Sequence, residues 1–266
     1  MPGPLIWVEP NTPLPDAEHG LTEPPGLVAA GLDLSVPRLI EAYRKGIFPW
    51  FSDGDPVLWW SPDPRMVLQT HELHVSKSLA KQLRQIARAQ NEGDFRVVVT
   101  LNQAFDAVIQ GCATRGATGR RDADTWITQE MLAVYRQWHA AGGAHSVETW
   151  VDGKLAGGLY GVGLGRMFFG ESMFTRVPNA SKLALVHLVR FLQEQHVALI
   201  DCQMQTEHLA SLGARAIDRP TFIRHVRQAV DEAPLDWQPG WMSPAGKRHP
   251  GLPVGVESKP IQATGS

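Results

Sequence analysis

The amino-acid sequence predicts a mixed α+β protein with a small N-terminal lobe and a larger C-terminal domain. Proline and aromatic residues without helical periodicity dominate the chain up to about residue 65. After them, segments with helical spacing of apolar residues mix with short runs of β-branched residues, as in α+β proteins. The end of the chain is dominated by proline, glycine, serine and charged residues, a composition typical of disorder. We therefore divide the chain into a lobe at 1–65, a domain at 66–237 and a disordered tail at 238–266.

The N-terminal lobe is expected to contain one short helix, at 34–46. Ser35 is a suitable N-cap, Pro37 lies in the first turn and Gly46 ends the helix. The sequence that follows, GIFPWFSDGDPVLWWSPDPR at 46–65, contains four prolines and three tryptophans. Since proline is excluded from helix interiors and central strands, we expect a shaped loop that carries large aromatic rings.

Periodicity predicts most elements of the C-terminal domain. Apolar residues recur on one face in five segments that should form helices: 74–91, 101–114, 127–143, 179–197 and 221–233. Runs of β-branched or apolar residues predict strands at 95–102 and 198–203. Within 145–174, Asp152-Gly153 is a strong hairpin signal and Gly165 suggests a second turn. We therefore expect a meander of about three strands there.

Composition and charge exclude several classes of protein. An apolar fraction of 43% with 20% charged residues is ordinary for a globular protein, and a net charge of −2 does not suit binding of nucleic acid by bulk electrostatics. Cys112 and Cys202 lie too far apart for a disulfide framework or a metal motif. Neither a secretory signal nor an apolar run long enough to span a membrane is visible. We expect a cytoplasmic monomer.

Missing motifs narrow the chemistry further. The sequence has no phosphate-binding loop of the G-x-x-x-x-G-K-[ST] type, and GVGLG at 161–165 is not followed by a predicted helix, as a dinucleotide site would require. H-E-x-x-H and G-x-S-x-G are absent as well. We therefore expect group transfer between bound substrates, with no metal and no cofactor.

Two features could contact a nucleic acid. Trp50, Trp59 and Trp60 either anchor a small core or offer stacking surfaces, each worth about 1–3 kcal/mol per base. Four cations share one face of the helix at 74–91 and form either a solvated surface or a patch for phosphates: Lys77, Lys81, Arg84 and Arg88. The sequence leaves both pairs of alternatives open.

Three polar residues near strand ends are candidates for chemistry. Glu171 lies between apolar residues in FFGESMF, where a carboxylate needs either an intramolecular cation such as Arg176 or a cationic substrate. Asp201 follows a buried strand, and Gln203 points the same way by the two-residue period. Such a pair can accept a proton and orient an amine, but the next helix also needs a cap, which Thr206 or Asp201 could supply equally well.

These segments are similar to one known family. GIFPWF…WWSPDPR and GESMF.R..NASK occur in order with TWIT, AHSVETW, GGLYGV, LIDCQ and HLASLGA, over about 23–222. In this combination the chain resembles the leucyl/phenylalanyl-tRNA–protein transferases. The resemblance implies an acetyltransferase-like (GNAT-like) C-terminal domain. It also implies transfer of Leu or Phe, and less well Met, from Leu-tRNA or Phe-tRNA to proteins with N-terminal Arg or Lys, which marks them for the N-degron pathway.

The resemblance also implies roles for single residues. Trp50 and Trp126 would contact the 3′-terminal adenosine, and four residues would line the pocket for the donor's side chain: Leu159, Phe168, Met173 and Leu188. Glu171 would lie beside the reacting groups and the acceptor's cationic end, while Asp201 and Gln203 would handle the attacking amine. The sequence departs from the family pattern at two positions, where a phenylalanine and an asparagine are expected: Leu188 and Thr206.

Two other functions remain open at this point. An acyl-CoA-dependent N-acetyltransferase would need a glycine-rich turn into a helix N-terminus to hold pyrophosphate, and GRMFFGESMFTRVPNASK offers none. A non-catalytic tRNA-binding module would need the tryptophans and the basic helix face, but not Glu171, Asp201 and Gln203.

Overall fold

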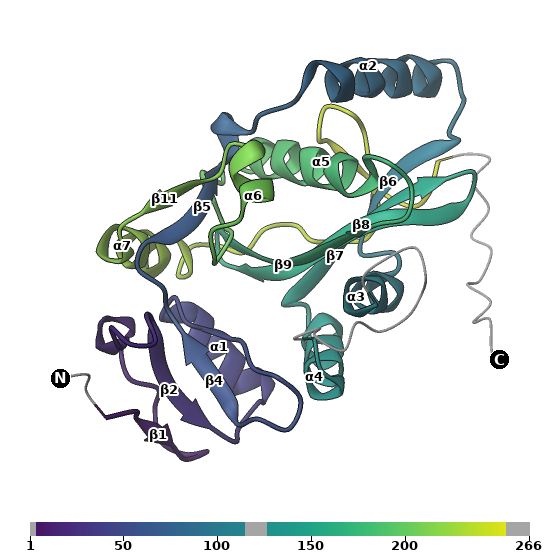
Figure 1. Cartoon of the computed structure of the whole chain (residues 1–266). Coiled ribbons are helices and arrows are strands. Elements are labelled where there is room, and N and C mark those ends of the chain that lie inside the picture. Colours follow the sequence, from purple (N-terminus) through teal and green to yellow (C-terminus); the bar gives the residue numbers. More distant parts are fainter. Residues whose placement is uncertain (1–3, 115–126, 254–266) are drawn as a thin grey trace.

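The computed structural model describes residues 4–114 and 127–253, which form two domains (Figure 1). The N-terminal domain consists of a four-stranded sheet in the order β1-β2-β4-β3 and helix α1. Its elements are β1 (Trp7–Val8), the 3₁₀ helix η1 (Ala17–His19), β2 (Leu27–Gly31), α1 (Val36–Arg44), β3 (Phe48–Pro49) and β4 (Val57–Trp60). The predicted cap of α1 is confirmed, because Ser35 Oγ accepts a hydrogen bond from the backbone N–H of Arg38 (3.3 Å).

The aromatic segment 46–65 is not the single loop that its prolines predicted. β3 and β4 lie within it, and β4 is an interior strand that pairs with both β2 and β3. The prolines do not prevent this, because Pro49 lies on the edge strand β3 and the other three flank β4 without interrupting it. Trp59 on β4 is 1% exposed and belongs to the core.

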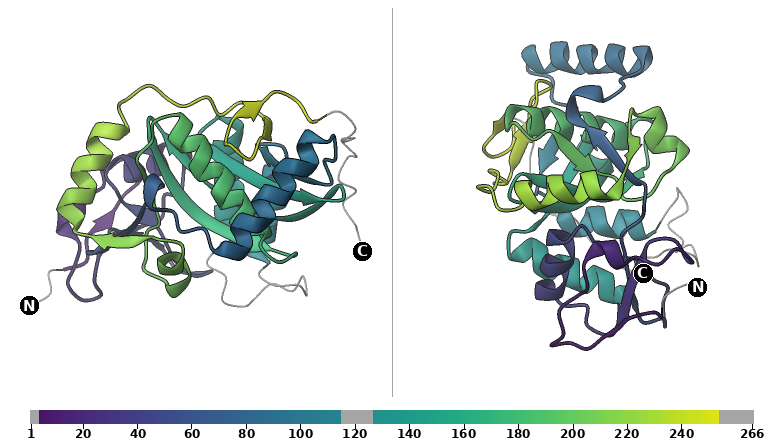
Figure 2. Two further views of the ribbon diagram at one scale, coloured as in Figure 1. Left: turned by 90° about the horizontal axis from the view of Figure 1, so that it is seen from above. Right: turned by 90° about the vertical axis from the view of Figure 1, so that its left-hand side faces the viewer.

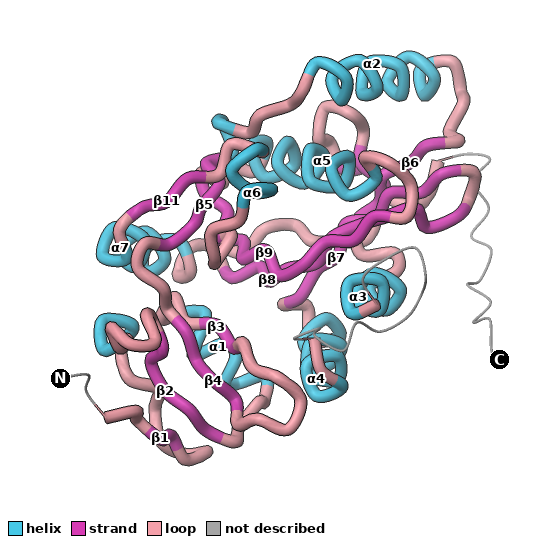
Figure 3. The backbone as a smooth tube through the Cα atoms, viewed as in Figure 1, coloured by secondary structure: helices cyan, strands magenta, loops and turns pink. Residues whose placement is uncertain are grey.

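The C-terminal domain is built on one nine-stranded mixed sheet, in the order β11-β5-β10-β9-β8-β7-β6-β12-β13. Its strands are β5 (Arg65–Gln69), β6 (Val97–Leu101), β7 (Ala144–Val151), β8 (Lys154–Leu164), β9 (Met167–Thr175), β10 (Leu199–Asp201), β11 (Arg215–Ile217), β12 (Gly240–Met242) and β13 (Arg248–His249). Its helices are η2 (Thr70–Glu72), α2 (Lys77–Asn91), α3 (Phe105–Ala113), α4 (Gln129–Ala140), α5 (Ala180–Glu194), α6 (Glu207–Ser211) and α7 (Arg219–Ala229). α5 and α2 lie on one side of the sheet, and α3 and α4 on the other (Figures 1 and 3). The predicted mixed α+β class is confirmed.

Most elements of this domain lie close to their predicted positions. The five predicted helices correspond to α2, α3, α4, α5 and α7. Asp152 and Gly153 both have positive φ (49° and 73°), as a type I′ turn requires, and they join β7 to β8. Gly165 (φ 54°) turns the chain from β8 into β9. The three-stranded meander is therefore confirmed.

The prediction of a disordered tail at 238–266 is wrong for its first part. β12 pairs with β6, with Gly240 opposite Leu101, and β13 pairs with β12. These strands belong to a segment at 233–249, the C-terminal strap, which runs along the sheet from α7 (Figure 2). The polar composition of the predicted tail hid the apolar side chain that fastens this part of the strap, Met242, which is buried in the core. Residues 254–266 lie outside the described residues.

A buried carboxylate caps the start of α3. Glu148 on β7 is fully buried and accepts hydrogen bonds from the hydroxyls of Ser146 and Thr100 (2.5 Å each) and from the backbone N–H of Ala104 (3.3 Å). Burial raises the pKa of Glu148 to about 7, although these hydrogen bonds act in the opposite direction.

Candidate active site

A cavity of about 470 Å³ opens between the two domains. β3 and the residue after it form one side, and β8, β9, α5 and the chain that follows β10 contribute the rest. The lining is largely apolar, with a few polar side chains: Glu171, Ser172, Gln203, Thr206 and His208. A concave apolar surface with few polar groups is the usual form of a small-molecule site.

The cavity lies where two parallel strands part. β9 and β10 are parallel, with Phe168 opposite Ile200 and Phe169 opposite Asp201, and α5 connects them. β10 ends at Asp201, whereas β9 continues to Thr175, so the last part of β9 has no neighbour on that side. Ligands of open sheets with parallel strands commonly bind at such a position, outside the carboxyl ends of the strands.

Glu171 is the extra residue of a β-bulge in β9. On β8, Tyr160 lies opposite Ser172, and the next residue, Gly161, lies opposite Gly170. Glu171 therefore has no partner in the register. A bulge re-aims the side chain that it carries and is common beside active sites. Here it aims the carboxylate at side chains from α1 and α4.

Three donors hold the Glu171 carboxylate. The hydroxyls of Tyr43 on α1 and Tyr135 on α4 donate to it (2.6 and 3.1 Å), and Gln203 donates through Nε2 (2.9 Å). Burial raises the pKa of Glu171 to about 7, against the lowering effect of these three hydrogen bonds. Arg176, considered as its partner from the sequence, instead holds its guanidinium over an aromatic ring.

The side chain of Gln203 is oriented by Glu171. Gln203 donates from Nε2 to Glu171, which as an ionised carboxylate only accepts hydrogen bonds, and Oε1 is left as the acceptor for a ligand. Gln203 has φ 61°, a left-handed conformation that is uncommon for this residue type and is often found at active sites. Its backbone N–H donates to Asp201 Oδ1 (2.8 Å), and its carbonyl accepts from the N–H of Met66 (3.3 Å).

Asp201 is buried behind Gln203 and does not line the cavity. Arg65 pairs with both of its oxygens, Nε with Oδ1 (2.8 Å) and Nη2 with Oδ2 (2.6 Å), and the two side chains are 1% and 0% exposed. The guanidinium carbon of Arg65 also lies 4.7 and 4.5 Å from the ring centroids of Phe48 and Phe222. The expected common direction of Asp201 and Gln203 is not found, because β10 ends at Asp201 and the two-residue period ends with it.

The four residues that the resemblance assigns to the donor pocket all line the cavity: Leu159, Phe168, Met173 and Leu188. Leu159 and Met173 face each other across β8 and β9, and Leu188 comes from α5. Leu185 and Ile200 line it as well. Periodicity alone did not separate these residues from the ordinary core of the sheet and helix.

The tryptophans of the aromatic segment have different environments. Trp50 lines the cavity and is 39% exposed, so its ring can contact a ligand. Trp60 packs edge-on against it, with ring centroids 5.8 Å apart, and its indole N–H donates to the Trp50 carbonyl (2.8 Å). Trp59 belongs to the core. Trp126, assigned with Trp50 to the adenosine, lies outside the described residues.

The basic face of α2 is separate from the cavity. Its four residues are exposed, and none lines the cavity: Lys77, Lys81, Arg84 and Arg88. Arg88 forms an ion pair with Glu92 one turn further along the helix (3.0 Å). Such an exposed pair contributes little to stability and leaves the arginine able to exchange partners.

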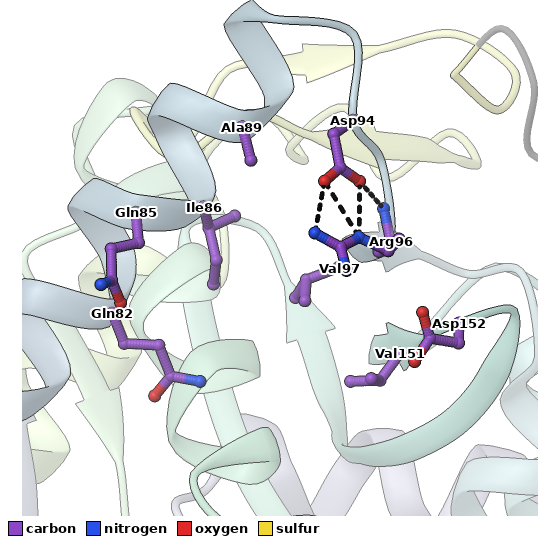
Figure 4. A pocket seen from close by; sticks show the side chains of 9 residues that line it. All are labelled: Gln82, Gln85, Ile86, Ala89, Asp94, Arg96, Val97, Val151 and Asp152. Carbon is purple, nitrogen blue, oxygen red and sulfur yellow. Dashed lines mark hydrogen bonds and ion pairs between the residues drawn. The ribbon is translucent and has the colours of Figure 1, made fainter.

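A second cavity, of about 340 Å³, lies between α2, the start of β6 and the turn from β7 to β8 (Figure 4). Asp94 and Arg96 lie in its lining and form an ion pair with each other (2.8 Å), so their charges are already matched. None of the described candidate residues from the sequence analysis lines this cavity. It carries no evidence of a second site.

The sequence analysis missed three side chains of the active site. Tyr43 and Tyr135 lie on the apolar faces of their helices, where nothing distinguishes them from core residues. Their hydroxyl oxygens nevertheless lie 2.6 Å apart, and each is within hydrogen-bond distance of Glu171. Arg65 ends the motif WWSPDPR, but its partner, Asp201, lies 136 positions away. The motif could have singled out Arg65 from the sequence, but nothing in the sequence showed that Arg65 contacts Asp201.

Comparison with known proteins decides the family. A model described as leucyl/phenylalanyl-tRNA protein transferase matches residues 67–227, and a model for the N-terminal domain of the same proteins matches 32–63. The leucyl/phenylalanyl-tRNA–protein transferase of Bordetella petrii is 57% identical over 246 residues, which cover 92% of this chain and 96% of that protein. The chain belongs to the leucyl/phenylalanyl-tRNA–protein transferase family. The family protein of Methylibium petroleiphilum is 54% identical over 238 residues, 88% of this chain and 87% of that protein.

As a leucyl/phenylalanyl-tRNA–protein transferase, the chain is an aminoacyltransferase. The two matched regions fall within the small domain and within the stretch from β5 to α7 of the large one. In the described part of the chain, no helix is long and apolar enough to cross a membrane. Within residues 4–114 and 127–253, no cluster of three histidine, cysteine, aspartate or glutamate residues could hold a metal ion.

Proposed function

We propose that this chain transfers leucine or phenylalanine, and methionine less well, from aminoacyl-tRNA to proteins that begin with arginine or lysine. The added residue marks the acceptor for the N-degron pathway. The observation that carries the proposal is the Gln203 amide, oriented by Glu171 in the wall of an apolar cavity, in a chain of this family. We infer that the enzyme acts in the cytoplasm as a monomer and needs no metal or cofactor.

The donor's side chain enters the apolar part of the cavity. Leu159, Phe168, Met173 and Leu188 offer it contacts and no buried charge. The 3′-terminal adenosine stacks on Trp50, whose ring is partly exposed at the cavity. The family resemblance assigns Trp126, outside the described residues, to the same ligand. Stacking of one base on an aromatic ring is worth about 1–3 kcal/mol.

The reaction needs no energy source beyond the donor ester. The acceptor's α-amine attacks the ester carbonyl carbon, a C–N bond forms, and the bond from that carbon to the ribose oxygen breaks. One proton leaves the amine and one reaches the ribose oxygen, so the reaction balances without ATP. A free α-amine has a pKa of about 7.7–8.0, so most of it is protonated at neutral pH. Gln203 Oε1 accepts a hydrogen bond from this amine and holds it beside the ester.

Asp201 and Glu171 act through Gln203. Asp201, locked by Arg65, fixes the backbone of Gln203, and Glu171 fixes its amide. Direct pairing of Glu171 with the acceptor's side-chain cation would have to displace Tyr43, Tyr135 or Gln203. In its ionised form Glu171 still favours a cation in the cavity, because little water screens its charge.

The remaining parts of the proposal concern tRNA and the fold. The basic face of α2 would meet tRNA phosphates outside the cavity, which suits a protein whose net charge is close to zero. The parallel strands β9 and β10, joined by α5 in a mixed sheet, are consistent with an acetyltransferase-like architecture for the large domain.

To test this, the purified protein is incubated with Leu-tRNA and a peptide that begins with arginine, without ATP. A peptide heavier by one leucine residue supports the proposal, and Gln203→Ala serves as the matched inactive control. Transfer from acetyl-CoA in place of charged tRNA would support an N-acetyltransferase. Binding of Leu-tRNA without any transfer would support a tRNA-binding module.

A further inference from the structure

Trp237, on the C-terminal strap, packs behind the donor pocket. Its indole lies 5.5 Å from the ring of Phe168 and 5.3 Å from that of Phe191, between ring centroids. On another side it stacks on His145, at 4.2 Å and an interplanar angle of 10°. Figure 2 shows how the strap runs from α7 toward the sheet, which it joins at β12.

Several contacts fix the indole in place. Asn102, which follows β6, donates from Nδ2 to the carbonyl of Trp237 (2.6 Å). A few residues later, β12 joins β6, with Gly240 opposite Leu101. The indole also fits against Gly163, where a Cβ atom would come within 2.7 Å of the indole nitrogen. Trp237 therefore has little freedom to move.

Phe168 is the residue through which Trp237 reaches the cavity. Its side chain is 1% exposed and forms part of the cavity wall. Its ring also packs closely over Gly161, where a Cβ atom would come within 2.5 Å of it. The ring thus lies against backbone on β8 and against the indole of Trp237. Without the indole, the ring would lose this neighbour and could tilt toward the space that the indole had occupied.

We propose that Trp237 is a positioning residue that sets the depth of the donor side-chain pocket by holding Phe168 in place. This inference rests on the proposed function, since it concerns the donor amino acid. The indole is partly buried against the core, so its removal leaves a space beside Phe168 that the neighbouring side chains fill only in part. Phe168 then tilts away from the cavity, the pocket deepens, and a large donor side chain gains contacts relative to leucine.

The experiment measures competition between Leu-tRNA and Phe-tRNA for one acceptor peptide. In Trp237→Ala, the ratio of kcat/KM for Phe-tRNA to that for Leu-tRNA should rise about tenfold, the size of effect that one methylene makes in an apolar pocket. Trp237→Phe keeps a ring and should shift the ratio in the same direction by less. Binding of non-hydrolysable leucyl- and phenylalanyl-amido-adenosine, measured by calorimetry, should shift in parallel.

Trp241→Ala is the matched control. Trp241 lies on the same strap, but it packs against Phe95 and His249 (5.7 and 4.3 Å) and does not line the cavity. It should leave the Phe/Leu ratio unchanged. A shift of less than twofold in folded Trp237→Ala, or in Trp237→Phe if the alanine variant does not fold, overturns the inference. An equal shift in Trp241→Ala overturns it as well. If the unmodified chain uses neither charged tRNA, the proposed function has failed instead.

Discussion

The buried Arg65–Asp201 pair should be costly to break. Both side chains are excluded from water, and two hydrogen bonds of 2.8 and 2.6 Å join them. Replacement of Asp201 by alanine leaves an unpaired guanidinium in the protein interior. Removal of one partner of a buried ion pair costs about 3–5 kcal/mol. We expect Asp201→Ala to lose that much free energy of unfolding in a urea titration.

A double variant separates stability from catalysis. Replacement of a whole buried ion pair by apolar residues is often neutral or stabilising, so Arg65→Met/Asp201→Leu should regain most of the lost free energy of unfolding. The double variant still lacks the oxygen that accepts a hydrogen bond from the backbone N–H of Gln203, so Gln203 should be misplaced. We therefore expect kcat for leucine transfer to stay at least about tenfold below that of the wild type, since small displacements of catalytic groups are costly. A wild-type urea midpoint for Asp201→Ala, or a wild-type kcat for the double variant, would refute this reasoning.

Three further predictions concern other parts of the molecule. Gln203→Ala should lower kcat by about 10²–10⁴ with tRNA binding unchanged, and collapse of tRNA binding at constant kcat would assign Gln203 to the donor instead. Alanine at all four positions of the α2 basic face should weaken tRNA binding and flatten its salt dependence by about one unit of slope per lost phosphate contact, as measured by titration at several salt concentrations; an unchanged slope would mean that the face is only solvated. The folded-state pKa of Glu148 is raised from 4.5 to about 7, so its stabilising contribution is complete below pH 4.5 and is lost as the pH rises through 7. Between pH 4.5 and 7, Glu148 should lower the free energy of unfolding of the wild type by up to about 1.4 kcal/mol per pH unit. The variant Glu148→Gln should lack this contribution, and urea titrations that give it the same pH profile as the wild type would contradict the prediction.

Local sequence patterns were sufficient to predict most helices and strands of the larger domain. Helical periodicity and the turn chemistry of Asp152-Gly153 are encoded within a few residues, so they can be read without knowledge of the fold. They were insufficient for β4 and for the C-terminal strap. β4 is stabilised by β2 and β3, and β12 by β6, which lies far away in the sequence. Pairing with neighbouring strands can thus make a segment a strand even where its own composition predicts a loop or disorder.

The same distinction holds for the active site. The resemblance identified several residues that line the cavity, and some of them, such as Leu159 and Met173, lie within recognisable motifs. It did not reveal how they are held. Tyr43 reaches Glu171 across 128 positions and Arg65 reaches Asp201 across 136, and no short pattern records either contact. The direction in which Asp201 points could not be deduced either, since it depends on the strand ending there.

The small domain supplies parts of the active site that the large one lacks. Tyr43 on α1 donates to Glu171, and the carbonyl of Gly46 accepts a hydrogen bond from Arg65 (3.3 Å). A copy without residues 4–60 would lose these supports of Gln203, and it would lose Trp50 from the cavity wall as well. The support of the amide and the surface proposed for the donor's adenosine would then disappear together. The two domains therefore form one catalytic unit, and the small domain is not an accessory that could be removed separately.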